Sequence, residues 1–165
     1  MKKTNSYGFD FAKVVRLPLF LLFFGIPAVA DENLDRLFRE MVMSGNLPEI
    51  QKLIDRGATI NGRAAYGETA LFYATIANQT NVVDLLLKHG ADVNLGDTEN
   101  RSPLMIAANA CNERIIASFL KHGAKVNQVN YEYRTALMNA VERNCNRSVV
   151  LLLKVKGIKL DLKDY

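Results

Sequence analysis

The sequence predicts an all-α protein, a solenoid of about four helix-turn-helix units joined by hairpin loops. The first observation is a regular step of about 33 residues, kept by the glycines Gly57, Gly90 and Gly123, the asparagines Asn61, Asn94 and Asn127, and the leucines Leu71, Leu104 and Leu137. The second is that each step holds two short apolar segments flanked by residues typical of helix ends. Such a pair cannot bury its apolar surface alone, so the units are expected to stack.

The second unit shows how each element is predicted. Residues 69–78 form its first helix, and Thr69 can cap that helix by accepting a hydrogen bond from a free backbone N–H. Residues 81–90 form its second helix, which Gly90 ends in a left-handed turn. In the next unit Pro103 stands at the first helical position, where no N–H is needed. The predicted repeats span about 33–61, 62–94, 95–127 and 128–165.

The fourth unit is the least regular. An extra residue near Val155 and Lys156 lengthens the step by one, and "GIKLDL" stands where an earlier unit has "GADVN". The turn glycine of the second unit, Gly67, is replaced here by Tyr133. Either this hairpin has a different turn, or a tyrosine is held in a left-handed conformation that bulky residues avoid. End repeats of a solenoid are commonly atypical because one of their faces meets water.

The segment 1–30 has the layout of a secretory signal peptide. A basic front is followed by the apolar run "LPLFLLFFGI" and by "AVA", which predicts cleavage after Ala30. The run is shorter than the roughly 20 residues of a membrane span. We therefore expect a signal peptide at 1–30 and a repeat domain at 31–165. The opening "MKK" and the "AVA" site favour a bacterial periplasmic protein, with secretion as the alternative.

The charge of the mature chain argues against nucleic-acid binding. The whole chain has 21 basic and 17 acidic residues, but the predicted signal peptide contains four of the former and one of the latter. The mature chain would therefore have a net charge of +1. Without a basic stripe, counterion release from nucleic acid contributes little. We expect neither a nucleic-acid partner nor a membrane span in the mature chain.

No catalytic or metal-binding motif is present in the sequence. It contains no nucleophile elbow, no Walker-type phosphate loop, no G-x-G-x-x-G and no H-E-x-x-H. His89 and His122 occupy equivalent positions near the ends of second helices, without a cluster of cysteines or carboxylates to complete a metal site. We interpret both as helix-end residues that can face the last carbonyls. The sequence predicts a protein that is not an enzyme and has no cofactor.

The repeated motifs are specific enough to indicate a family. "GETALFYA" and "RSPLMIAA", with "VVDLLLKHGADVN" after the first, resemble the ankyrin repeat over nearly all of the mature chain. The resemblance implies a non-catalytic protein interaction module. Its usual binding surface is the concave face, formed by the hairpin tips and the first helix of each unit. It also implies a chain that is monomeric when unbound.

The variable positions of the family motif can be transferred to this chain. They predict a partner-binding set of Met43, Tyr66, Glu68, Ile76, Thr98, Glu99, Arg101, Asn109, Tyr131, Glu132, Arg134, Glu142 and Arg143. Tyrosine and arginine are typical of binding hot spots because they cover apolar area while keeping polar groups. The alternative is that the hairpin tyrosines only pack on the next hairpin and that the charges are solvated.

The two cysteines, Cys111 and Cys145, fall at adjacent positions of neighbouring repeats, near the turn between first and second helices. In an exported protein an even pair favours a disulfide. Equivalent positions of stacked repeats are expected to lie farther apart than the Cα separation of about 4.4–6.8 Å that a disulfide needs. The one-residue offset could close that gap, so a disulfide and two buried thiols are both open.

These observations lead to one main functional hypothesis and two alternatives. The main hypothesis is a periplasmic binding protein that grips one protein partner, as an adaptor, a protector of a periplasmic enzyme or an immunity protein against a toxic effector. The first alternative is a secreted effector that binds host proteins. The second is a thiol-redox protein using Cys111 and Cys145, although no C-x-x-C motif is present.

Overall fold

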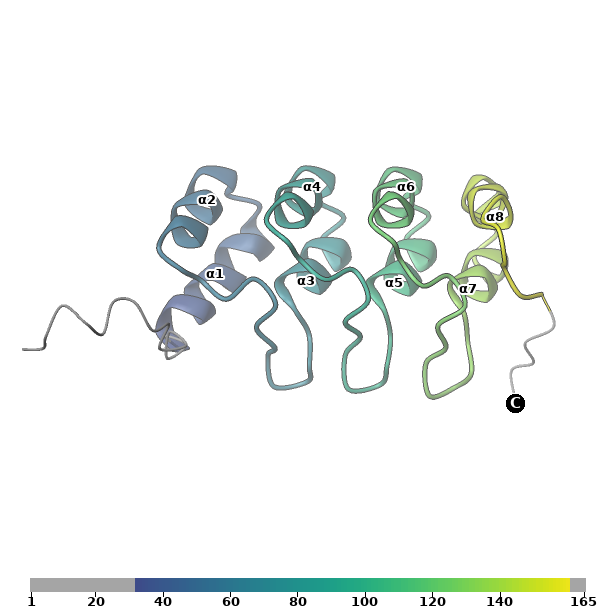
Figure 1. The fold of residues 1–165 in the computed structure, drawn as a ribbon, viewed down its shortest axis with the longest axis horizontal. Helices are drawn as coiled ribbons and strands as arrows, with labels where there is room; N and C mark the ends of the chain where they lie inside the picture. Colours follow the sequence, from purple (N-terminus) through teal and green to yellow (C-terminus); the bar gives the residue numbers. More distant parts are fainter. Residues whose placement is uncertain (1–31, 161–165) are drawn as a thin grey trace, which may run out of the picture.

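The computed structural model of the protein describes residues 32–160, and the predicted signal peptide lies outside them. Within this range the chain forms eight α-helices and no strands, as the sequence predicts. The helices are α1 (Glu32–Ser44), α2 (Leu47–Asp55), α3 (Ala70–Ile76), α4 (Thr80–Lys88), α5 (Pro103–Asn109), α6 (Glu113–Lys121), α7 (Ala136–Glu142) and α8 (Asn146–Leu153). They form two layers, with α1, α3, α5 and α7 in one and α2, α4, α6 and α8 in the other (Figure 1).

The first helix of each of the last three repeats begins at a capping hydroxyl. Thr69 Oγ1 accepts a hydrogen bond from the backbone N–H of Phe72 over 3.2 Å, and the hydroxyls of Ser102 and Thr135 cap their helices in the same way. These bonds satisfy N–H groups that have no partner inside the helix. Helix α3 ends at Ile76 and not at the predicted residue 78, because the chain turns into a left-handed conformation at Asn78.

The core lies between the two helix layers and is continuous from α1 to α8. The alanines at one position of the first helices, Ala74, Ala107 and Ala140, are completely buried. Their small side chains allow the helices of neighbouring repeats to approach closely. Apolar residues of the second helices, such as Leu86 and Phe119, fill the space above them. The stack is therefore held by burial at each junction.

An asparagine that recurs in each of the first three repeats links that repeat to the next. Asn94 donates from Nδ2 to the carbonyl oxygen of Gly123 over 3.3 Å, and its Oδ1 accepts from the backbone N–H of Lys125 over 2.8 Å. Asn61 and Asn127 bind the following repeat in the same way. One side chain thus satisfies two backbone groups of the next turn, which explains why the asparagine recurs with the glycine.

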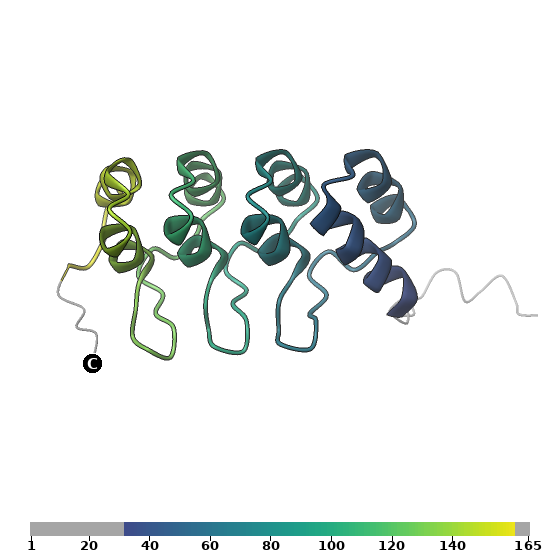
Figure 2. The same ribbon diagram turned by 180° about the vertical axis from the view of Figure 1, so that it is seen from behind.

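The hairpin loops before α3, α5 and α7 all project to the same side of the helix layers (Figure 2). Neighbouring loops are joined through their backbones, since Thr98 N–H donates to Tyr66 over 2.9 Å and Tyr131 N–H donates to Glu99 over 3.1 Å. The last loop keeps the turn of the others, because Tyr133 has φ 60° where Gly67 has φ 79°. Of the two possibilities left open by the sequence, the tyrosine held in a left-handed conformation is correct.

Candidate functional site

The predicted partner-binding residues lie on the hairpins and at the ends of the first helices. Met43 lies in the last turn of α1, and Ile76, Asn109 and Glu142 are the final residues of α3, α5 and α7. Arg143 follows as the C-cap of α7. The others lie on the three hairpins: Tyr66, Glu68, Thr98, Glu99, Arg101, Tyr131, Glu132 and Arg134. We call this surface, made of the thirteen predicted residues, the concave face.

Large apolar side chains on this face are exposed to solvent. Tyr66 and Tyr131 each have 73% of their surface exposed, and Met43 and Ile76 have 58% and 57%. The hairpin tyrosines therefore do not simply pack against the next hairpin. Exposed aromatic and aliphatic side chains on one face of a protein are typical of a protein-binding surface.

A hollow of about 220 Å³ lies on the concave face between repeats 3 and 4. Five predicted residues line it, namely Arg101, Asn109, Glu132, Arg134 and Glu142. The sequence interpretation missed the other four residues of the lining, Met105, Ile106, Asn130 and Asn139. A signal for Asn139 was present, since it is polar where Tyr73 and Ile106 stand in the preceding repeats. The walls of the hollow consist of two guanidinium groups, two carboxylates and three amides, together with the apolar residues Met105 and Ile106.

Arg101 is held in place by acidic residues of its own hairpin. Its Nη2 lies 2.6 Å from the buried carboxylate of Asp97, and its Nε lies 3.4 Å from Glu99. The hydrogen bond to Asp97 is the main cause that raises the pKa of Arg101 above its ordinary value. Asp97 also accepts from the backbone N–H of Glu99 and of Arg101, which fixes the turn. The guanidinium is thus oriented before any partner arrives.

Arg134 and Arg143 are held by contacts within repeat 4 and across its junction. Arg134 pairs with Glu142 and donates from Nε to Asn139 over 3.2 Å. Arg143 donates from Nε to Oδ1 of Asn109, in the preceding repeat, over 2.7 Å. The first contact belongs to one repeat, whereas the second spans two. The position of Arg143 therefore depends on how repeats 3 and 4 are joined.

At the other end of the face, Glu68 interacts with Tyr73 on α3. Burial is the main cause that raises the pKa of Tyr73, followed by the negative charge of Glu68. The positive charge of Arg39 acts in the opposite direction. Glu68 and Tyr73 occupy the positions that Arg134 and Asn139 occupy in repeat 4. The same contact between hairpin and helix is therefore acidic in repeat 2 and basic in repeat 4.

Comparison with protein families decides what kind of array this is. A family model described as ankyrin repeats (3 copies) matches residues 31–97 and 94–164. The chain belongs to the ankyrin-repeat family. A search of curated proteins finds no match. Ankyrin repeats are generally non-catalytic modules of protein–protein interaction, which suggests a protein partner.

The cysteines join two ankyrin repeats through a disulfide. Cys111 and Cys145 have Cα atoms 5.3 Å apart, within the range that a disulfide requires. Cys111 lies in the turn after α5 and Cys145 is the N-cap of α8. The one-residue offset between them closes the distance between repeats, because it places the turn residue of one repeat opposite the N-cap of the next.

The two histidines have different surroundings. Nδ1 of His122 lies 2.8 Å from the carbonyl oxygen of Ser118, so this ring faces the end of its own helix. Nε2 of His89 instead lies 3.1 Å from Oε1 of Gln51 on α2, in the preceding repeat. Residues 32–160 contain no group of three or more histidines, cysteines or carboxylates placed to hold a metal ion. In the same range, no helix is long and apolar enough to cross a membrane.

Repeat 4 has an apolar outer face that the sequence interpretation missed. Val141 is 56% exposed, although the equivalent residues Thr75 and Ala108 are completely buried. Val141 lines a hollow of about 430 Å³ together with Leu137, Leu160 and other residues. The signal was present in the sequence, since valine here stands where the other repeats have residues covered by a following repeat.

Proposed function

We propose that this chain is a non-catalytic binding protein that holds one protein partner on its concave face. The observation that supports it most is the exposure of Met43, Tyr66, Ile76 and Tyr131, four large apolar side chains contributed by repeats 1, 2 and 4. Their removal from water on binding would supply affinity, since tyrosine in particular covers a large area at low entropic cost. Arginines fixed by Asp97 and Asn109 supply directional contacts beside them.

We further propose that the protein acts in the bacterial periplasm, after export and cleavage at Ala30. The basic front, the apolar run and the "AVA" site of residues 1–30 support export. The disulfide accords with an oxidising compartment. Within that compartment, a small binding array of this kind would act as an adaptor, as a protector of a periplasmic enzyme or as an immunity protein against a toxic effector.

The face is tested by capture of partners on the purified chain. We expect Tyr66→Ala with Tyr131→Ala to lose a partner that the wild-type protein retains, because both side chains are exposed and their loss leaves the core intact. Arg114→Ala on the exposed surface of α6 serves as the control and should retain the partner. Equal retention by the tyrosine variant, with an unchanged circular dichroism spectrum, would remove the concave face from the proposal.

The location is tested by cell fractionation of the full-length chain in a Gram-negative host. Export predicts a periplasmic protein shortened to begin at Asp31, as N-terminal sequencing would show. Recovery from the culture medium would favour the secreted effector that binds host proteins. Full-length protein found only in the cytoplasm would contradict both.

A further inference from the structure

We propose that the Cys111–Cys145 disulfide is a redox-controlled clasp that fixes the half of the concave face formed by repeats 3 and 4. This inference rests on the proposed function for the role of that face. Reduction of the clasp would loosen α8 and release the contact between Arg143 and Asn109. The oxidised chain would therefore present the complete face, and the reduced chain only the part formed by the earlier repeats.

The clasp occupies a position that the preceding junction fills with hydrogen bonds. At each junction, the turn residue of one repeat faces the N-cap of the second helix in the next repeat. At the junction of repeats 2 and 3 these two residues are Asn78 and Asn112. At the junction of repeats 3 and 4 they are Cys111 and Cys145. Asn112 donates from Nδ2 to Oδ1 of Asn78. Its own Oδ1 accepts from the backbone N–H of Ile115 over 3.0 Å. Asn112 therefore both joins two repeats and caps α6.

The cysteines join the two repeats by one covalent bond, but they do not replace the cap. Within the described residues, Cys145 makes no side-chain hydrogen bond that caps α8. Cys111 is held at φ 54°, a left-handed conformation that asparagine tolerates better than cysteine. When the bond is broken, neither cysteine has a side chain that can restore the contact made by Asn112. The junction of repeats 3 and 4 thus depends on the oxidation state, whereas the junction of repeats 2 and 3 does not.

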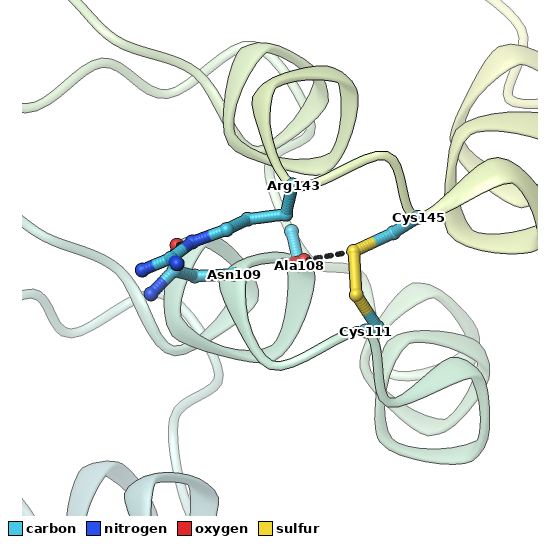
Figure 3. Close-up of a disulfide and its surroundings, with 5 residues drawn as sticks. All are labelled: Ala108, Asn109, Cys111, Arg143 and Cys145. Atoms are coloured by element: carbon cyan, nitrogen blue, oxygen red, sulfur yellow. Dashed lines mark hydrogen bonds between the residues drawn. A yellow bond between two sulfur atoms is a disulfide. The ribbon is translucent and has the colours of Figure 1, made fainter.

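The disulfide clasp lies close to a hydrogen bond between two residues of the concave face, Arg143 and Asn109. Asn109 and Arg143 each precede a cysteine by two residues, and they are joined by the 2.7 Å hydrogen bond from Arg143 Nε. Figure 3 shows this pair and the disulfide on opposite sides of Ala108. The same two turns are therefore joined by the disulfide on one side and by the hydrogen bond between Arg143 and Asn109 on the other. Movement of one turn relative to the other would separate Arg143 from Asn109.

The surroundings of the two sulfur atoms suit thiol–disulfide exchange. Cys111 is exposed, whereas Cys145 is 6% exposed. A thiolate of a dithiol reductant would attack Sγ of Cys111, and the electron pair of the S–S bond would leave on Sγ of Cys145. The second thiol of the reductant then breaks the mixed disulfide, so that the reductant becomes a disulfide and two electrons and two protons reside on the cysteines. A disulfide oxidant reverses both steps and is itself reduced to a dithiol.

Two features favour the released sulfur of Cys145. As a thiolate it would lie at the N-terminus of α8, where free N–H groups stabilise negative charge. As a thiol it would have an acceptor, because its Sγ lies 3.5 Å from the carbonyl oxygen of Ala108. A disulfide sulfur has no hydrogen to donate, so this contact becomes a hydrogen bond only in the reduced chain.

The test compares hydrogen exchange of the oxidised and dithiothreitol-reduced full chain, with thiol counting to confirm each state. We expect reduction to accelerate exchange of the α8 amides about tenfold or more, with α4 unchanged, since local opening limits exchange. The NMR signal of Arg143 Nε–H should weaken in parallel. The double variant Cys111→Ser with Cys145→Ser should behave as the reduced chain in either condition.

The matched control is Cys111→Asn with Cys145→Asn, which places the asparagine pair of the preceding junction at this one. This variant should protect α8 and Arg143 and should not respond to dithiothreitol. Exchange rates of the α8 amides that differ by less than about twofold between the oxidised and reduced wild type would overturn the clasp.

Loss of partner capture in the reduced wild type but not in the oxidised one would support control of the face. A partner held equally by both states would refute that control, and retention by the tyrosine variant with the redox response intact would refute only the proposed function.

Discussion

Helices α6 and α8 occupy the same place in successive repeats, yet they are stabilised in different ways. Helix α6 is capped by Asn112, and its first core residue, Ile115, is completely buried. Helix α8 has Cys145 as its N-cap and no capping side chain among the described residues, and Ser148 stands where α6 has Ile115. The hydroxyl of Ser148 is buried and has no hydrogen-bond partner in the part of the chain that the structure describes.

The difference shows that the start of α8 is held by a covalent bond where α6 has a capping side chain and a side-chain hydrogen bond between repeats. A missing cap and an unpaired buried hydroxyl each cost about 1 kcal/mol or more. The disulfide offsets them by restricting the unfolded chain. Repeat 3, in contrast, combines a cap, an apolar core position and a hydrogen-bonded junction. At the start of the second helix, repeat 3 therefore depends on several local interactions, whereas repeat 4 depends on the disulfide.

The largest expected effect is that of removing the disulfide. Cys111→Ser with Cys145→Ser should lower the free energy of unfolding by about 3–4 kcal/mol, because the bridge closes a loop with a sequence separation of 34. Urea unfolding followed by circular dichroism measures the change, and reduced wild type provides the reference. A loss below about 1 kcal/mol would mean that repeat 4 does not depend on its covalent bond.

The hydrogen-bonded junction is tested at its central residue. Asn112→Ala should lower the free energy of unfolding by about 1–2 kcal/mol, because it removes both the cap of α6 and the bond to Asn78. Asn112→Asp keeps the acceptor for the cap but loses the donor, so it should lose only part of this stability. If the alanine variant unfolds at the same urea concentration as wild type, the two junctions are not comparable.

The weakness in the core of α8 can be repaired. Ser148→Val should raise the free energy of unfolding by about 1 kcal/mol, because it removes an unpaired hydroxyl and adds apolar surface where repeat 2 has Val82. Ser148→Ala, which removes the hydroxyl without adding volume, should give a smaller gain. Destabilisation by valine alone would indicate that this site is already filled, and that α8 differs from α6 by its cap only.

The smallest expected effect is the pH dependence of stability that Tyr73 contributes in repeat 2, away from both junctions compared above. The folded chain raises the pKa of Tyr73 above its ordinary value of 10.0, chiefly through burial and then through Glu68. Because the folded state holds this proton more tightly, the stabilisation is present below about pH 10 and is lost as the pH rises through the raised pKa. Tyr73→Phe should therefore have a different slope of stability against pH from about pH 10 upwards, measured by urea unfolding at several pH values. An unchanged slope would contradict this assignment.

The repeat architecture could be predicted because its signals are local. Thr69, Pro103 and Gly90 each act within one helix end, where a hydroxyl, a missing N–H or a left-handed turn decides the conformation. Because these signals recur at equivalent positions of successive repeats, each repeat supported the helices and turns predicted in the others. Tyr133 was ambiguous because its intrinsic preference opposes the turn, and the fold around it prevailed.

The site was only partly predictable. Tyr66 and Tyr131 could be placed on the hairpins from their repeat position alone, and the structure finds both exposed. The shape of the hollow beside Asn139 could not be derived, since it depends on how far apart two hairpins lie. The exposure of the Val141 side chain could not be derived either, because it depends on which face of repeat 4 is covered by another repeat. No pattern within a single repeat contains that information.

The sequence by itself determined the number of repeats, the two helices in each and the caps and turns that bound them, because backbone preferences act over a few residues. Only the tertiary structure decided which residues of different repeats meet. The pairing of Cys111 with Cys145, of Asn78 with Asn112 and of His89 with Gln51 depends on the distance and rotation between stacked repeats. Those quantities result from packing of the whole core, in which every helix contributes to the position of its neighbours.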